Sequence, residues 1–304
     1  MIDFQRLKLE QKAEYESILF SCPDRGCEYS FANLYLWGHQ QAAILHGCVA
    51  FFSHFNGRSV YPYPIGHGDR KAAIWDILND ARERGIPCRI TNMRREDWAE
   101  LEGWFPGKFL VRIDRDSFDY VYDIDELADL KGRKFQKKRN HVNRFLQEHP
   151  DYRMQPLTKE NITAAREMVQ QWYDSRIQED PHGDYLLERK AMERAFRCYD
   201  ALGMEGLILS DGGEILAMTM ASRLSDTIMD VHFEKAREDE DGAYAMINRE
   251  FARYLREKYP ELRFLNREDD IGLEGLRRAK LSYQPHHMIE KCWACLPEDV
   301  DGTL

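Results

Sequence analysis

The chain carries near its middle the basic stretch Lys131-Gly-Arg-Lys-Phe-Gln-Lys-Lys-Arg-Asn-His-Val-Asn-Arg-Phe145. Seven Lys and Arg residues fall between Lys131 and Arg144 with no Asp or Glu among them, although the whole chain has a formal net charge of −10. A chain of 304 residues exceeds the size of one ordinary core. We therefore expect this stretch to lie at a seam between two domains.

The elements predicted on the two sides of the stretch follow one order: two helices, a hairpin, a strand, a helix, a strand, a helix and closing strands. On the N-terminal side they are predicted at 7–20, 29–37, 42–53, 59–63, 69–84, 87–91, 94–104, 109–113 and 119–124. On the C-terminal side they are predicted at 159–173, 185–202, 206–221, 227–233, 242–259, 263–266, 272–282 and 287–293.

The repeated order predicts an α+β protein made of duplicated domains with mixed sheets. We expect an N-terminal domain over 1–125, a basic inter-domain helix over 126–150 and a C-terminal domain over 151–304. The order resembles that of the GNAT acyltransferase fold. In that fold two strands splay apart and leave a cleft for an acyl donor.

The composition, with 43% apolar and 32% charged residues, is typical of a soluble globular protein. The sequence shows no signal-peptide pattern at Met1 and no apolar run long enough to span a membrane. We therefore expect a cytoplasmic protein without integral membrane association. Seven scattered cysteines do not suggest a disulfide framework, and Cys292-Trp-Ala-Cys295 lacks a second pair for zinc, so no metal site is predicted.

Helical spacing places one cation of the basic stretch in an apolar stripe. Arg139 falls between Phe135, Val142 and Leu146, and Lys138 lies at the edge of the stripe. A guanidinium in such a place is costly unless a carboxylate or another anion meets it. Arg139 is therefore expected either to pair with an internal acid or to hold an anion in the inter-domain cleft. The other basic side chains point to solvent, as a hydrated surface or a nucleic-acid contact.

The predicted helix over 272–282 presents a second inward cation. Lys280 projects between Leu273 and Leu276, and Arg277 shares this face. The Lys280 side chain either extends along its methylenes to water or approaches an acidic partner or an anionic ligand.

Polar residues follow the short strand before that helix, in Asn266-Arg-Glu-Asp-Asp270. Residues at the carboxyl end of a strand often line a site. One of Asp269 and Asp270 is explained as a helix cap. The remaining acids are expected to pair with Lys280 or Arg139.

The strand predicted at 227–233 and the turn after it carry further acids. Alternation places Asp230, His232 and Glu234 on one face, which is either solvent-exposed or the wall of a cleft. The turn from Glu234 to Gly242 has five acids against two bases, at the place where acetyl-CoA-binding members of the GNAT fold use a basic, glycine-rich turn for the pyrophosphate. Such a turn repels a pyrophosphate, so we expect no cofactor and do not expect acetyl-CoA.

Four segments give a more specific resemblance. They are Tyr29-Ser-Phe-Ala-Asn-Leu-Tyr-Leu-Trp37, Lys137-Lys-Arg-Asn-His-Val-Asn-Arg-Phe145, Asn266-Arg-Glu-Asp-Asp-Ile-Gly272 and Leu276-Arg-Arg-Ala-Lys-Leu-Ser-Tyr-Gln-Pro285. The chain resembles, over nearly its whole length, a bacterial family grouped with the C-terminal domain of phosphatidylglycerol lysyltransferases. It is more distantly similar to the Fem-type peptidoglycan aminoacyltransferases, which are also tandem GNAT domains.

This resemblance implies transfer of an aminoacyl group from charged tRNA to an amine or hydroxyl acceptor. The acceptor would be a small molecule, a peptide or a lipid headgroup, and a soluble or peripheral one is favoured because this chain lacks the membrane spans of the lysyltransferases. By motif, Arg139 falls in the inter-domain helix and Lys280 matches the lysine near the transfer site.

The residues expected to act catalytically are Lys280, Glu234, Asp269 and Asp270. Lys280 would hold the donor phosphate or the oxyanion, and the acids would orient or deprotonate the acceptor. The residues expected to bind substrate are Arg139, Lys138, Asn266, His232, Arg277 and Tyr283. Two other hypotheses stay open: a non-catalytic module that binds an anion or RNA, and an acyl-CoA N-acyltransferase.

Overall fold

The computed structural model describes residues 1–22, 25–55, 57–179 and 185–300, and the chain divides into two compact units. Unit 1 takes residues 1–119, 269–277 and those from 288 on, and unit 2 takes residues 120–268 and 278–287. Among the described helices, none is both long and apolar enough to cross a membrane.

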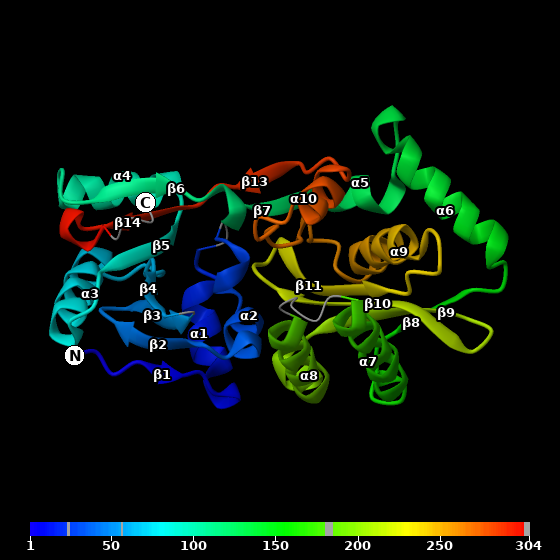
Figure 1. Cartoon of the computed structure of the whole chain (residues 1–304), viewed down its shortest axis with the longest axis horizontal. Coiled ribbons are helices and arrows are strands. Elements are labelled where there is room, and N and C mark those ends of the chain that lie inside the picture. Colours follow the sequence, from blue (N-terminus) through cyan, green and yellow to red (C-terminus); the bar gives the residue numbers. More distant parts are fainter. Residues whose placement is uncertain (23–24, 56, 180–184, 301–304) are drawn as a thin grey trace. The chain divides into compact units, whose positions relative to one another are not determined.

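Unit 1 is built on a seven-stranded mixed sheet in the order β1-β2-β3-β4-β5-β14-β6 (Figure 1). Its strands are β1 (Gln5–Arg6), β2 (Gln40–Leu45), β3 (Cys48–Phe55), β4 (Arg58–Pro62), β5 (Arg89–Met93), β6 (Leu110–Ile113) and β14 (Cys292–Cys295). Its α-helices are α1 (Lys12–Leu19), α2 (Phe31–Trp37), α3 (Arg70–Arg84) and α4 (Arg95–Trp104). Ile74 and Ile77 of α3 and Leu101 of α4 join Tyr61 and Ile90 of the sheet in one buried core.

Unit 2 is built on a second seven-stranded mixed sheet, in the order β13-β7-β12-β11-β10-β9-β8. Its strands are β7 (Asp119–Asp123), β8 (Arg153–Pro156), β9 (Glu205–Asp211), β10 (Glu214–Arg223), β11 (Ile228–Ala236), β12 (Phe264–Asn266) and β13 (His287–Ile289). Its helices are α5 (Ile124–Asp129), α6 (Gln136–Glu148), α7 (Ile162–Glu179), α8 (Tyr185–Leu202) and α9 (Ala243–Lys258), and α10 (Glu274–Leu281) begins in unit 1 and ends in unit 2. Helices α7 and α8 lie on one side of the sheet and α9 on the other (Figure 1).

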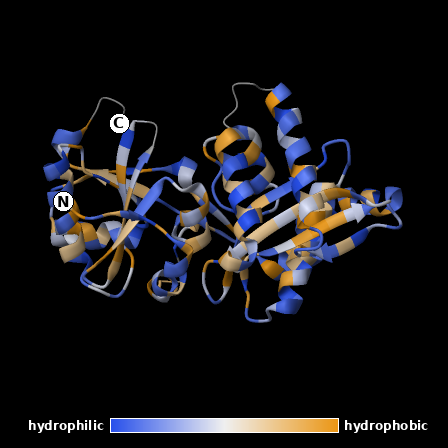
Figure 2. Ribbon diagram, turned by 90° about the horizontal axis from the view of Figure 1, so that it is seen from below, coloured by the Kyte–Doolittle hydropathy of each residue, from blue (hydrophilic) through white to orange (hydrophobic). Residues whose placement is uncertain are grey.

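Local sequence accounts for the boundaries of several elements. The Asp69 side chain accepts a hydrogen bond from Ala72 N at the start of α3, and Gly85 ends this helix in the left-handed conformation, as predicted. In α9, Met246, Ile247, Phe251 and Leu255 are buried and form one apolar face. Figure 2 shows the helices carrying both hydrophobic and hydrophilic residues, as expected for helices that cover a sheet on one side. The repeated element order predicted from the sequence is confirmed.

The prediction that 109–113 and 119–124 form one closing pair is wrong. Strand β6 pairs with β14 in unit 1, whereas β7 pairs with β12 in unit 2. The expected closing strand at 287–293 also divides, into β13 of unit 2 and β14 of unit 1. Asp119 to Tyr122 are all buried, as in a central strand covered on both faces, which alternation at the sequence level did not reveal.

This exchange of strands makes both units discontinuous, unlike the boundaries expected at 125 and 151. Residues 120–150, with β7 and the basic helix α6, belong to unit 2. Residues 269–277 and 288–300 belong to unit 1, where β14 pairs with β5 and β6, although β13 pairs in the sheet of unit 2.

Candidate functional site

The sheet of unit 2 opens between β11 and β12. The two strands pair in parallel from Ile228 opposite Phe264 to Asp230 opposite Asn266, and β11 then continues to Ala236 without β12 beside it. The pairing of β10 with β11 skips His232, which is a β-bulge, a feature that redirects side chains and is frequent beside active sites. The splay expected from the fold resemblance is therefore present in unit 2.

Glu234 and Arg267 bridge this opening. Glu234 Oε1 lies 2.8 Å from Arg267 Nη2, and the amide of Asn248 donates a hydrogen bond to Glu234 Oε2 over 3.2 Å. Arg267 Nη1 is buried and has no hydrogen-bond partner among the described residues. Burial is the largest single influence on the pKa of Arg267 and lowers it, but the combined attraction of Glu234, Tyr122 and Tyr283 outweighs burial and raises the pKa. The guanidinium therefore stays charged, with one of its nitrogens uncommitted.

Two cations share the ring of Tyr283. Lys138 Nζ lies 3.6 Å from the ring centroid and Arg267 Cζ lies 4.9 Å from it. Burial, together with the positive charge of Arg267, lowers the pKa of Lys138 to about 8, and Glu234 opposes this only in part. Within the described residues, no carboxylate lies within ion-pairing distance of Lys138. Such a perturbed lysine in a cleft is a candidate functional group.

A pocket of about 390 Å³ adjoins these residues at the beginning of α9. Lys138, His141, Tyr244 and Tyr283 line it, together with the acidic turn between Arg237 and Gly242. Lys138 and Tyr283, both predicted to bind substrate, are thus brought together at one concave surface.

His232 lies at the centre of a second polar group in the opening. Its Nε2 is 2.8 Å from Ser222 Oγ, and its Nδ1 is 3.1 Å from Glu268 Oε1 and 3.5 Å from Asp230 Oδ2. Asp230 and His232 lie beside each other, as expected for residues on one face of the strand. Glu234, which was expected on the same face, pairs with Arg267. The donor atoms of Asp230, His232 and Glu268 lie within 4.8 Å of one another and could hold a divalent cation, although ordinary hydrogen bonds also account for their placement.

The structure places Lys280 and Arg139 against backbone carbonyls. Lys280 is buried, as predicted, and its Nζ donates to the carbonyl oxygen of Arg267 over 2.5 Å. Arg139 donates to the carbonyl oxygens of Leu130 and Gly132 rather than to an internal carboxylate, and the alternative that it holds an anion stays a prediction. Lys280 therefore supports the backbone of Arg267, and Arg139 supports the turn before α6.

The other residues predicted to form the site are divided between the two units. Asp269, Asp270 and Arg277 belong to unit 1, where Arg277 Nε lies 2.9 Å from Asp270 Oδ2. Arg115 also pairs with Asp270, over 3.3 Å, and Asp270 accepts a hydrogen bond from the backbone N–H of Gly272, as expected for the acid that caps this turn. The pairing of the other acid with Lys280 stays a prediction. Asn266 is buried at the end of β12, where its side-chain oxygen accepts a hydrogen bond from the backbone N–H of Glu268.

The acidic turn before α9 is tied to helix α6. Asp241 pairs with His141 and Arg144, and this pairing lowers the pKa of the Asp241 carboxyl. Gly242 has a φ of 88°, and a Cβ there would lie 2.4 Å from the carbonyl oxygen of His141. The beginning of α9 is thus closely covered by α6.

Most of the basic stretch is engaged within its own unit. Lys131 pairs with Asp129 over 2.7 Å and Lys134 with Glu126 over 2.6 Å, both at exposed positions. Arg144 of α6 pairs with Asp241, whereas Lys131 and Lys134 precede the helix. Three of the seven cations therefore have carboxylate partners among the described residues.

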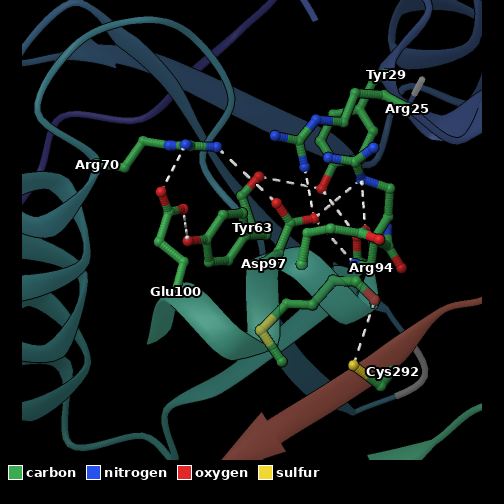
Figure 3. A network of polar contacts seen from close by, with 11 residues as sticks. Arg25, Tyr29, Tyr63, Arg70, Arg94, Asp97, Glu100 and Cys292 are labelled. Atoms are coloured by element: carbon green, nitrogen blue, oxygen red, sulfur yellow. Dashed lines mark hydrogen bonds and ion pairs between the residues drawn. The ribbon is translucent and has the colours of Figure 1, made fainter. Parts of the chain in front are cut away.

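In unit 1, the beginning of α4 after strand β5 takes part in a largely buried ion network (Figure 3). Arg25 Nη1 lies 2.6 Å from Asp97 Oδ2, and both side chains are almost fully buried. The backbone N–H of Arg94 donates to the same oxygen over 2.9 Å, and Arg70 pairs with Glu100 over 2.7 Å. Each of these charges has a fixed partner.

The sequence led to Lys138 and Tyr283 but missed Arg267 and Ser222. Arg267 stands between Asn266 and Glu268 at the carboxyl end of β12, and this position was the signal that could have identified it. Ser222 faces the site only through the register of β10 with β11, which the sequence does not display.

Comparison with solved structures supports the fold and shows a protein related to this chain in sequence. A conserved protein of unknown function from Bacteroides thetaiotaomicron is 36% identical, with a TM-score of 0.92 over 97% of this chain and 100% of that one. L-PGS from Bacillus licheniformis is 14% identical, with a TM-score of 0.71 over 97% and 94%. FemX is 10% identical, with a TM-score of 0.59 over 97% of both chains. The last two likenesses show the fold alone, and this fold is the tandem GNAT-like one.

Sequence comparison identifies the family. An uncharacterized protein of Mycoplasmoides gallisepticum is 24% identical over 196 residues, which are 63% of this chain and 60% of the length of that relative. The model of the family "Phosphatidylglycerol lysyltransferase, C-terminal" matches residues 21–295. The chain belongs to the family of phosphatidylglycerol lysyltransferase C-terminal domains.

Proposed function

We propose that this chain is an aminoacyltransferase that moves an aminoacyl group from charged tRNA to an amine or hydroxyl acceptor in the opening between β11 and β12. The observation that carries the proposal is the convergence of Lys138 and Arg267 on the ring of Tyr283, with Glu234 paired to Arg267, beside a pocket of about 390 Å³. Two cations against one carboxylate suit the negative charge that develops on an ester carbonyl. Membership in a family of lysyltransferase domains makes a lysyl group the first donor to test.

Each residue of the opening has a distinct role in the proposal. Lys138 is the cation exposed to the pocket, and Arg267 adds positive potential from its buried position. Glu234 fixes the Arg267 guanidinium, and Lys280 is a positioning residue that holds the Arg267 backbone. The acceptor is a small molecule, a peptide or a lipid headgroup.

Acetyl-CoA is not the donor in this proposal. The turn before α9 keeps its acids, and α6 covers the beginning of the helix where a pyrophosphate would have to bind. Since a bound ligand raises the melting temperature, coenzyme A is expected to leave it unchanged in a thermal-shift experiment.

The direct test incubates the purified chain with tRNA charged with labelled lysine and a panel of amine and hydroxyl acceptors. Lys280→Ala is expected to lower transfer about a hundredfold, because displacing Arg267 removes about 3 kcal/mol of stabilisation from the charged transition state. Arg278→Ala, on the exposed side of the same helix, is the matched control and is expected to keep the wild-type rate. Wild-type transfer by Lys280→Ala contradicts the role of this lysine, and no transfer from any charged tRNA contradicts the function.

A further inference from the structure

Lys138 differs from the other cations of its stretch in its surroundings. It is half-buried, lines the pocket and has an aromatic ring rather than a carboxylate as its nearest partner. It lies three residues after Phe135 and four before Val142, both buried, so the packing of α6 turns it inward. We propose that Lys138 carries a proton between the attacking nitrogen of a primary amine acceptor and the leaving oxygen of the donor. This inference rests on the proposed function.

The charges that face Lys138 allow it to lose its proton near neutral pH. Burial and the fixed charge of Arg267 bring its pKa to about 8, while the opposing Glu234 is bound to Arg267. On its own helix, His141 and Arg144 are turned to Asp241.

The acids of the adjoining turn are engaged as well. Arg237 binds Asp239 and Glu214, Glu238 pairs with Arg176, and Glu240 pairs with His149. The surroundings of Lys138 therefore hold no uncommitted carboxylate among the described residues that line the pocket.

The chemistry of acyl transfer to an amine requires such a group. An alkylammonium has a pKa of about 10.4 and must enter as the free amine, releasing one proton to water. When its nitrogen forms the C–N bond, it must lose a second proton, which neutral Lys138 accepts. The C–O bond of the ester then breaks, and the leaving oxygen takes this proton from the Lys138 ammonium. The lysine ends each cycle as it began, and a carrier whose pKa is near the ambient pH is the most effective.

The first arm of the test needs no substrate. Trace labelling of the intact chain with acetic anhydride between pH 6 and pH 11, read by mass spectrometry of peptides, gives the titration midpoint of Lys138. A lysine-containing peptide with a midpoint of about 10.4 is the internal standard. The expected midpoint is near 8, and Arg267→Met is expected to raise it because a repulsive charge is removed and Glu234 is released. A midpoint at or above 10 overturns the inference.

The second arm measures transfer to a matched amine and alcohol. When the rate of transfer to the amine is divided by the fraction of acceptor present as free amine at each pH, it is expected to increase with pH and to level off near pH 8. Lys138→Arg, which keeps the charge but cannot give up its proton, is expected to lower this transfer by about a hundredfold or more. A wild-type rate for Lys138→Arg, or transfer to the alcohol alone, overturns the proton-carrying role while leaving the proposed function intact. A midpoint near 8 without transfer to either acceptor overturns the proposed function, and the role of Lys138 with it.

Discussion

The openings beside the third strand of each repeat occupy equivalent places but have different contents. In unit 1, β4 and β5 pair through Pro62 opposite Thr91, and beyond this the Tyr29 hydroxyl lies 3.0 Å from the carbonyl oxygen of Tyr63 and 3.4 Å from that of Asn92. One buried tyrosine thus joins the two strands. In unit 2 the same place holds Glu234 and Arg267, with a pocket beside them. In unit 1 the Tyr29 hydroxyl closes the gap between the two strands, whereas in unit 2 the charged side chains of Glu234 and Arg267 occupy it.

The two regions also differ in how their charges are satisfied. In unit 1, Arg25 and Asp97 are bound to each other in the interior, and Arg70 is bound to Glu100. In unit 2, Lys138 faces a ring and an arginine, and its pKa falls to about 8. Charges with fixed partners stabilise a fold, whereas a charge kept without one is available for chemistry. Four stability experiments test this difference between the two units.

The largest effect is expected for Asp97→Ala. This substitution leaves Arg25, of which 4% of the side chain is exposed, without its carboxylate. Removing one partner of a buried pair costs about 3–5 kcal/mol, so urea unfolding should show a loss of this size. Arg95→Ala breaks the exposed pair with Glu290 and is the control, with an expected loss of about 1 kcal/mol or less. A loss under 1 kcal/mol for Asp97→Ala would show that the network in unit 1 is not structural.

Lys291→Met tests a second buried network of unit 1. Lys291 Nζ lies 2.6 Å from both Glu28 and Asp119, and burial already raises the pKa of Glu28. Without the cation the folded-state pKa of Glu28 rises further above its unfolded value, so stability is kept at low pH and lost as the pH rises. The expected deficit is about 3 kcal/mol at pH 7 and smaller at pH 5. An equal deficit at both pH values would argue against this coupling, and Lys131→Met, at an exposed pair, is the control.

Tyr29→Phe removes the hydroxyl that joins β4 and β5. The two carbonyl oxygens lose a donor that they share, and a buried hydrogen bond contributes about 1 kcal/mol. Thermal unfolding should show a loss of about this size, with no change in transfer. A drop in transfer with unchanged stability would mean that unit 1 takes part in the reaction.

The smallest effect is a gain in stability from Lys138→Met. The pKa of Lys138 is lowered from 10.5 to about 8 in the folded state, so the charged lysine weakens folding below pH 8 and has no such effect above pH 10.5. Because the group is partly exposed, the gain at pH 7 is expected to be only about 0.5–1 kcal/mol. Denaturation at pH 7 and at pH 10.5 should show the gain at the lower pH alone.

The repeated order of elements was predictable from the sequence because it follows from local periodicity and turn residues. The exchange of β7 and β14 between the sheets was not, since any apolar strand can pair with more than one edge. On α6, helical spacing identified the correct face within one residue. The stripe is formed by Phe135, Val142 and Phe145 rather than Leu146, and this choice brings Lys138 inward beside Tyr283. Which of the two neighbouring residues, Phe145 or Leu146, faces the core is decided by tertiary packing and not by helical spacing.

The central claim is that the opening in unit 2, and not its counterpart in unit 1, performs the transfer. Two matched substitutions test it in one lysyl-transfer assay: Glu234→Gln releases Arg267, and Glu100→Gln releases Arg70. The account predicts that Glu234→Gln lowers kcat/KM about a hundredfold through displacement of a group in the site, while Glu100→Gln keeps the wild-type value. Equal losses for the two variants, or a larger loss for Glu100→Gln, would contradict it.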